Sequence, residues 1–160
     1  MSDFDVGTIG LEEVISINIR VAKPIVVGQD DVVGRRQLIP ITSGEVTGPD
    51  GIKGTVLPGG VDSQIIRPDG KCELSARYAI QMDDGACIYV ENNGIRTVPE
   101  EWVKDVVAGK FVDPSLYYFC TVPTFEVYDP KYKWLTTHIF VCCATRLPDS
   151  VLLKFYKLNQ

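Results

Sequence analysis

The stretch that decides the fold runs from Lys53 to Gly94 and reads KGTVLPGGVDSQIIRPDGKCELSARYAIQMDDGACIYVENNG. Turns built from glycine or Asp-Gly separate short runs that are rich in valine, isoleucine, leucine and tyrosine. Glycine and aspartate supply the positive-φ positions of tight turns, so this rhythm is typical of antiparallel hairpins. The pattern therefore predicts a sheet built mainly from hairpins, and it predicts no particular reaction.

Residues 72–98 carry the clearest hairpin signal in the chain. From Cys72 to Gln81, apolar and polar side chains alternate with the period of a half-buried strand. The turn Met82–Gly85 leads into a second strand over 86–91, and Asn92–Gly94 is expected to turn the chain again. Comparable signals predict further strands over residues 14–21, 36–46, 52–57, 63–67, 116–124, 135–146 and 150–158, whereas 21–36 is interpreted as a loop or ragged edge.

One short helix is predicted near residues 98–108. Thr97 and Glu100 have the spacing of a capping box, with Thr97 as the N-cap. Pro99 would sit in the first turn, where its missing N–H is tolerated, and Gly109 would supply the left-handed stop. The apolar residues of the segment fall on one stripe, which we expect to dock on the sheet.

The predicted elements favour a mainly β fold in a single domain over residues 1–160. Nine or ten strands and one helix are expected, with no internal repeat. An open sheet of that many strands tends to curl or close, because closure removes its exposed edges. We therefore predict a closed or nearly closed antiparallel β-barrel, with the helix plugging one end or packing outside, and a two-sheet sandwich as the alternative.

Composition excludes several classes of partner and compartment. The chain has a net charge of −5, and its 16 lysines and arginines are scattered, which disfavours nucleic-acid binding. The acidic first residues lack the basic and apolar regions of a secretory signal, so none is expected there, and no apolar run approaches the length of a membrane helix. The five cysteines form an odd set and fit free thiols. We therefore expect a cytoplasmic protein that does not engage a membrane.

Five motifs from Gly34 onward occur in an order found in one microbial family. They are GRRQLIPITSGEVTG, GTVLPGGVDSQIIRPDG, SARYAIQMDDGACIYVENNG, VDPSLYYFCTVPTFEV and YKWLTTHIFV. On these motifs the chain resembles the domain of unknown function 3237 family, also catalogued as uncharacterised protein family 0311. The resemblance implies a β-barrel somewhat like the lipocalins or other calycins, and no activity is established for the family as a whole.

The resemblance also points to three polar positions: Asp62 after a double glycine, Arg77 in an Ala-Arg-Tyr tripeptide, and Glu126 in a Thr-Phe-Glu tripeptide. If the three converge, Arg77 could orient a carbonyl or carboxylate ligand while one acid moves a proton. The alternatives are a structural salt bridge or plain solvent exposure. Alternation places Arg77 opposite an apolar face, so its direction depends on which face fills the barrel.

The chain departs from the family pattern at Ser75, Cys120 and Val127, where an aspartate, an arginine and a threonine are common. These departures reduce the number of polar residues that the chain shares with the family pattern. They leave open whether activity is lost or specificity altered.

Aromatic residues supply a second set of candidate ligand contacts. Tyr89, Tyr118 and Trp134, together with Tyr117 and Phe140, could line a cavity for a flat or apolar small molecule. The alternative is ordinary core packing, since strands favour aromatic residues. Both interpretations stay open.

No metal or cofactor is expected. His138 is the only histidine, and no second histidine lies at metal-ligand spacing. Adjacent Cys142 and Cys143 would point to opposite faces of a strand, and Cys142 lies too far along it to bond to His138. Cys120 remains the one thiol open to a chemical role.

Three functions are compatible with this sequence. The first is the binding of a small, partly apolar metabolite inside the barrel. The second is a cofactor-independent isomerase, cyclase or hydrolyase that uses Asp62 or Glu126 as acid or base in the same pocket. The third is a homodimer formed through an exposed edge at 24–34 or at Pro40.

Overall fold

Ten β-strands form one antiparallel sheet in the computed structural model of the chain, which describes residues 4–160. The strands are β1 (Gly10–Val21), β2 (Ile25–Asp30), β3 (Gly34–Thr47), β4 (Lys53–Val56), β5 (Gly60–Ile66), β6 (Cys72–Met82), β7 (Cys87–Thr97), β8 (Tyr118–Val127), β9 (Phe140–Arg146) and β10 (Ser150–Asn159). The helix α1 (Glu100–Val107) and the 3-10 helices η1 (Pro49–Gly51), η2 (Pro114–Leu116) and η3 (Pro130–Thr136) lie between strands.

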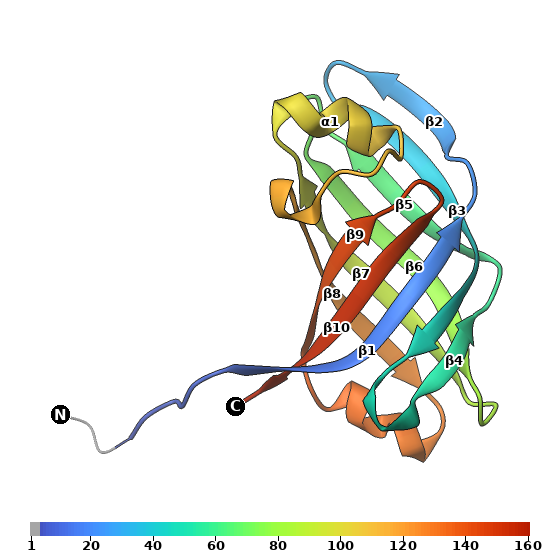
Figure 1. The fold of residues 1–160 in the computed structure, drawn as a ribbon, viewed down its shortest axis with the longest axis vertical. Helices are drawn as coiled ribbons and strands as arrows, with labels where there is room; N and C mark the ends of the chain where they lie inside the picture. Colours follow the sequence, from blue (N-terminus) through green and yellow to red (C-terminus); the bar gives the residue numbers. More distant parts are fainter. Residues whose placement is uncertain (1–3) are drawn as a thin grey trace.

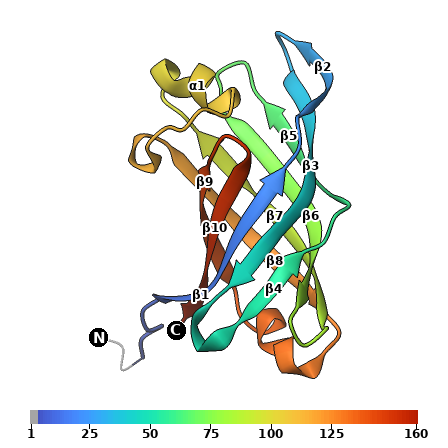
Figure 2. The ribbon, with the colours of Figure 1, turned by 45° about the vertical axis from the view of Figure 1, so that its right-hand side comes forward.

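The sheet closes on itself because β1 pairs with β10 on one side and with β3 on the other. Going round from β10, the order is β9, β8, β7 and β6. Strands β4 and β5 then share one place in the wall, since each pairs with both β3 and β6. The result is a closed barrel of eight strands with two extra strands (Figure 1, Figure 2), which confirms the predicted class.

The predicted hairpin over residues 72–98 is confirmed, but its second strand is longer than expected. β6 and β7 pair from Cys72 opposite Arg96 to Gln81 opposite Cys87. The prediction of a turn at Asn92–Gly94 was wrong, because the chain stays extended to Thr97. Gly94 instead permits close approach of the next strand, since a Cβ built on it would lie 2.3 Å from the carbonyl oxygen of Cys120.

Residues 21–36, interpreted as a loop or ragged edge, contain the strand β2. It pairs with β3 through an irregularity between Val26 and Gly28, and its side chains are exposed along its length. β2 ends the strand order of the sheet and so keeps one free edge. Pairing of this edge with a second copy of the chain stays a prediction.

The helix near residues 98–108 is confirmed, but its predicted capping box was wrong. Thr97 is the last residue of β7, Pro99 occupies the N-cap, and no side chain caps the helix there. Gly109 does adopt a left-handed conformation, with φ of +77°. The strand predicted from residue 135 begins only at Phe140, because η3 occupies the preceding segment.

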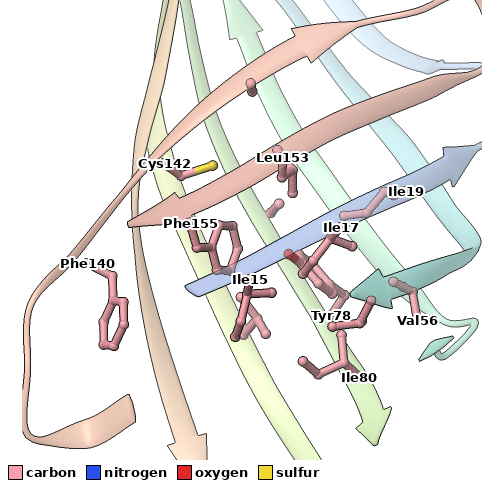
Figure 3. Close-up of a cluster of buried hydrophobic side chains, with 14 of the residues drawn as sticks. Ile15, Ile17, Ile19, Val56, Tyr78, Ile80, Phe140, Cys142, Leu153 and Phe155 are labelled. Atoms are coloured by element: carbon pink, nitrogen blue, oxygen red, sulfur yellow. The ribbon is translucent and has the colours of Figure 1, made fainter. Parts of the chain in front are cut away.

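An apolar core runs along the inside of the barrel and fills it at the end near η3 (Figure 3). Tyr78 and Phe155 are almost fully buried within this core. Phe140 packs edge-on against Phe125, with ring centroids 5.3 Å apart, and contacts Trp134 of η3. Burial of this apolar surface is the main stabilising contribution to the fold.

The opposite end of the barrel is covered by α1 (Figure 1). Val103 of α1 lies against the β5–β6 turn, 3.2 Å from a Cβ built on Gly70. Just after the helix, a Cβ built on Gly109 would lie 3.1 Å from the carbonyl oxygen of Pro148 in the β9–β10 turn. With Val106 buried, α1 therefore spans the mouth of the barrel from one hairpin turn to another.

Among residues 4–160, no helix has the length and apolar character needed to cross a bilayer.

Candidate functional site

The interior-facing positions change from apolar to polar as the strands approach α1. On β7, the buried face begins with Ile88 and Val90 and continues with Asn92 and Arg96. Because side chains alternate along a strand, residues two apart share a face, so the polar pair points into the same barrel as the apolar pair. Buried polar residues from neighbouring strands join them: Gln37 of β3, Gln64 of β5, Thr121 of β8 and Arg146 of β9.

A hydrogen-bonded chain of side chains crosses from β3 to β5. The Nε2 of Gln37 donates to the Oε1 of Gln64 over 2.9 Å, and the Nε2 of Gln64 donates to the Oδ2 of Asp62 over 2.8 Å. The second carboxylate oxygen of Asp62, Oδ1, is buried and has no partner within the described part of the chain. Gln64 therefore holds one carboxylate oxygen of Asp62, the backbone of Ser75 adds a further interaction with this carboxylate, and the side chain lines the interior.

Two arginines in the same region have no neutralising carboxylate at ion-pair distance among residues 4–160. Arg96 is only 2% exposed, and its Nε and Nη1 atoms have no hydrogen-bond acceptor among residues 4–160. Its guanidinium carbon lies 5.5 Å from the centroid of the Phe119 ring, a cation–π geometry. Arg146 is also buried, and its Nε has no acceptor in the described chain.

Burial shifts the ionisation of these groups. It raises the pKa of Asp62 above the usual range of an aspartate, although the hydrogen bond from Gln64 and the positive charges of Arg96 and Arg146 act in the opposite direction. It lowers the pKa of Arg146, with repulsion from Arg96 as the next cause. Burial also raises the pKa of Tyr78, so this hydroxyl is neutral. Two guanidinium groups therefore face at most one carboxylate, and the region carries excess positive charge.

A cavity lies among these residues. The space open to the centre of a water-sized sphere is about 40 Å³, enough for a few water molecules or a narrow part of a ligand. Leu74, Ala76 and Leu153 form part of its apolar wall, and Phe119 adds an aromatic surface. Its polar lining consists of Asp62, Gln64, Tyr78, Asn92, Arg96, Thr121 and Arg146.

The three polar residues suggested by the family motifs do not converge in the structure. Asp62 lines the cavity, but Arg77 lies on the outer face of β6, where its side chain is 62% exposed and its Nε is 4.0 Å from Glu91. Glu126 is exposed on β8 and accepts a hydrogen bond from Tyr128. The reason is strand alternation: the apolar face of β6 fills the barrel, so Arg77, one residue beyond Ala76, must point outward.

The three aromatic candidates also lie away from the cavity. Tyr89 occupies an outward position of β7, between the buried Ile88 and Val90, and Tyr118 is exposed at the start of β8. Trp134 packs against the core at the η3 end. The aromatic residues that line the cavity are Tyr78 and Phe119.

The remaining candidate groups are separate from this interior site. His138 is exposed beside η3, where its Nδ1 lies 3.0 Å from the carbonyl oxygen of Trp134. Cys120 lies on the wall of the barrel, with its Sγ 3.9 Å from that of Cys143 on the adjacent strand. No group of three or more potential metal ligands occurs within residues 4–160.

Sequence reasoning missed the two buried arginines. The signal was present, since Arg146 has the same strand parity as Phe140 and Ala144 and is therefore a charged residue on an apolar face. For Arg96, the expected turn at 92–94 interrupted the alternation that would have placed it inside.

Comparison with known proteins places the chain beside uncharacterised relatives. The family model described as Protein of unknown function (DUF3237) matches residues 9–158. A UPF0311 protein of Clostridium acetobutylicum is 70% identical over 148 residues, which cover 92% of this chain and 93% of the relative. A crystal structure of a protein with unknown function from the same organism has a TM-score of 0.90 and 66% sequence identity, covering 97% of this chain and 100% of the other. A β-barrel-like protein of Acinetobacter baumannii has a TM-score of 0.85 and 35% identity, covering 98% and 100%.

Proposed function

The chain belongs to the family of proteins of unknown function named DUF3237, and we propose that it binds a small, partly apolar metabolite inside the barrel, at the end covered by α1. The observation that carries this proposal is the set of buried polar atoms around one cavity that have no hydrogen-bond partner among residues 4–160, which includes Asp62 Oδ1, Asn92 Oδ1 and Arg96 Nε. Buried polar groups are nearly always hydrogen-bonded, because desolvating them without a partner is costly. A ligand that meets these atoms removes that cost.

The apolar part of the wall supports a ligand with a carbon skeleton. Leu74, Ala76 and Leu153 offer the ligand no hydrogen bond, so they favour contact with carbon atoms over water. The polar atoms fix its orientation and the apolar wall supplies burial. Because α1 spans the mouth, we expect ligand access to require movement of α1 or of the two hairpin turns that it contacts.

A thermal-shift screen against a library of small metabolites tests the proposal. At least one compound should raise the melting temperature of the wild-type protein, because a ligand that binds only the folded state stabilises it. The variant Ala76→Leu, which fills the cavity, should lose that response. Ala79→Leu introduces the same side chain on the outer face of β6 and should keep it. A response that survives Ala76→Leu would place binding elsewhere, and a library without any response would contradict the proposal.

A second candidate, a cofactor-independent isomerase, cyclase or hydrolyase, is favoured by the environment of Asp62. A carboxyl with a raised pKa and a buried oxygen beside the cavity can transfer a proton to or from a bound molecule. Glu126, the other carboxylate considered for this role, is exposed outside the barrel. With a compound identified by the screen, Asp62→Asn should retain binding and lose turnover. Equal turnover in the variant and the wild type would exclude Asp62 as the acid or base.

A further inference from the structure

We infer that the ligand of this cavity is an organic anion, a carboxylate or enolate, that also carries a hydroxyl or N–H donor. The inference rests on the proposed function and specifies the chemistry of the molecule bound. It depends on three features of the cavity: the charge of its lining, the hydrogen-bond donors and acceptors of the lining that lack partners in the described chain, and the size of the open space.

The charge of the lining is the first step. Arg96 and Arg146 bring two positive charges into the barrel, and Asp62 is the acidic residue among the lining groups. Neither arginine is paired with a carboxylate within the described residues, and both are buried. Burial of an uncompensated charge is far more costly than burial of a neutral polar group. Water molecules could accept hydrogen bonds from the guanidinium groups, but only an anion would neutralise them.

The free atoms define the second step. Within residues 4–160, the N–H groups of the lining without an acceptor are Nε and Nη1 of Arg96 and Nε of Arg146, which require acceptor oxygens. The lining acceptors without a partner there are Oδ1 of Asp62 and Oδ1 of Asn92, which require a donor. The hydroxyls of Tyr78 and Thr121 also lack a partner there and can either donate or accept. A simple inorganic anion such as chloride has no donor to offer the two acceptors. A molecule with both an anionic oxygen and a hydroxyl matches both sets.

The shape of the site is the third step. Only about 40 Å³ is open to the centre of a water-sized sphere. The cavity is therefore narrow in its present form, and it favours a small or flat skeleton. The guanidinium of Arg96 lies over the ring of Phe119. This cation–π contact restrains the guanidinium that would bind the anionic oxygen of the ligand.

Two pairs of probes test the charge requirement in the unmodified protein by isothermal titration calorimetry. Lactate and lactamide have the same size and the same hydroxyl but differ in charge, and 4-hydroxybenzoate and 4-hydroxybenzamide repeat the comparison on a flat ring. For at least one pair, the carboxylate should bind ten-fold more tightly than its amide, or better, because a charge-assisted hydrogen bond is about twice as strong as a neutral one. This comparison needs no variant to fold.

Variants then locate the preference. Arg96→Met and Arg146→Met should each reduce the affinity for the carboxylate ten-fold or more while changing the affinity for the amide little. Arg77→Met makes the same substitution on the outer wall and should leave both affinities unchanged. Circular dichroism would check that the variants remain folded.

The possible failures are distinguishable. If the amides bind as tightly as the carboxylates, or if the preference survives both interior variants, the inference is wrong. If neither carboxylate binds but neutral compounds give a thermal shift that Ala76→Leu abolishes, the proposed binding function stands and the anionic ligand is excluded. If no compound of any kind binds, both fail together.

Discussion

Replacing Arg96 by methionine should make the unliganded protein more stable. The arginine is buried, two of its nitrogens have no acceptor in the described chain, and no carboxylate there lies at ion-pair distance from it. Methionine keeps an unbranched, flexible side chain and removes the charge. A buried polar group without a partner costs about 1–3 kcal/mol, and more when it is charged. Loss of the cation–π contact with Phe119 offsets about 0.5–2 kcal/mol of the gain.

The net expectation is an increase of about 1–2 kcal/mol in the free energy of unfolding, similar to the gains seen when buried ionic groups are replaced by hydrophobic ones. For a domain of this size, each kcal/mol raises the melting temperature by about 2–4 °C. Urea unfolding at pH 7 in buffer without added carboxylates would measure the difference directly. The gain in stability should accompany the loss of ligand binding, as expected where a binding residue is retained at the expense of stability.

Arg77→Met is the matched control for this experiment. Arg77 lies on the outer face of β6 in a long, solvent-exposed ion pair with Glu91, so its replacement should change stability by less than about 0.5 kcal/mol. If Arg96→Met instead destabilised the protein by more than about 1 kcal/mol while the control did not, Arg96 would be a structural residue with adequate partners. That outcome would refute the reasoning and weaken the case for a ligand.

Three other predictions concern separate features. Gly94→Ala should lower the free energy of unfolding by about 1–3 kcal/mol, because the new Cβ would meet the β8 backbone. Gly28→Ala on the open strand β2 should change it by less than about 1 kcal/mol. Equal effects of the two variants in urea unfolding would contradict the close approach of β8 to Gly94. Burial raises the pKa of folded Asp62 above its unfolded value, so stability should fall as pH rises through that interval, and Asp62→Asn should flatten the fall; parallel pH–stability curves would refute this. Hydrogen peroxide should oxidise Cys120 and Cys143 to a disulfide with loss of two hydrogens and reduction of the peroxide to water; mass spectrometry that finds only separately oxygenated sulfurs would exclude the link.

The barrel was predictable because its signals are local. The turn residues and the two-residue alternation between Cys72 and Met82 require only a few neighbouring positions to be recognised. Closure followed from the number of strands. The incorrect turn at Asn92–Gly94 was also predicted from a local signal, because these residues have the composition of a turn. In the structure, pairing of β7 with both β6 and β8 keeps the segment extended.

The site was less predictable because it depends on which face of each strand turns inward. Asp62 was identified from the family motif, whereas Arg77 and Glu126 come from the same kind of motif and lie outside. The buried arginines belong to β7 and β9, strands that are not neighbours in the wall. Their meeting depends on the register of the intervening strand, and a single sequence carries no direct record of that register.

The pairing of the first and last strands has a consequence for protein engineering. Gly10 lies opposite Asn159, so β1 and β10 run beside each other and leave the barrel at the end remote from α1 (Figure 1). A short flexible linker could join the start of the chain to its end. The circular chain could then be cut beside Gly85 in the β6–β7 turn, where a Cβ built on the glycine would meet no atom within 4 Å. Such a circular permutant would retain all the strand pairs of the native wall. In the native chain, β6 and β7 pair across a short turn. In the permutant these two strands would lie at opposite ends of the chain, and contacts between residues distant in sequence form more slowly. We therefore expect slower folding to the same final structure.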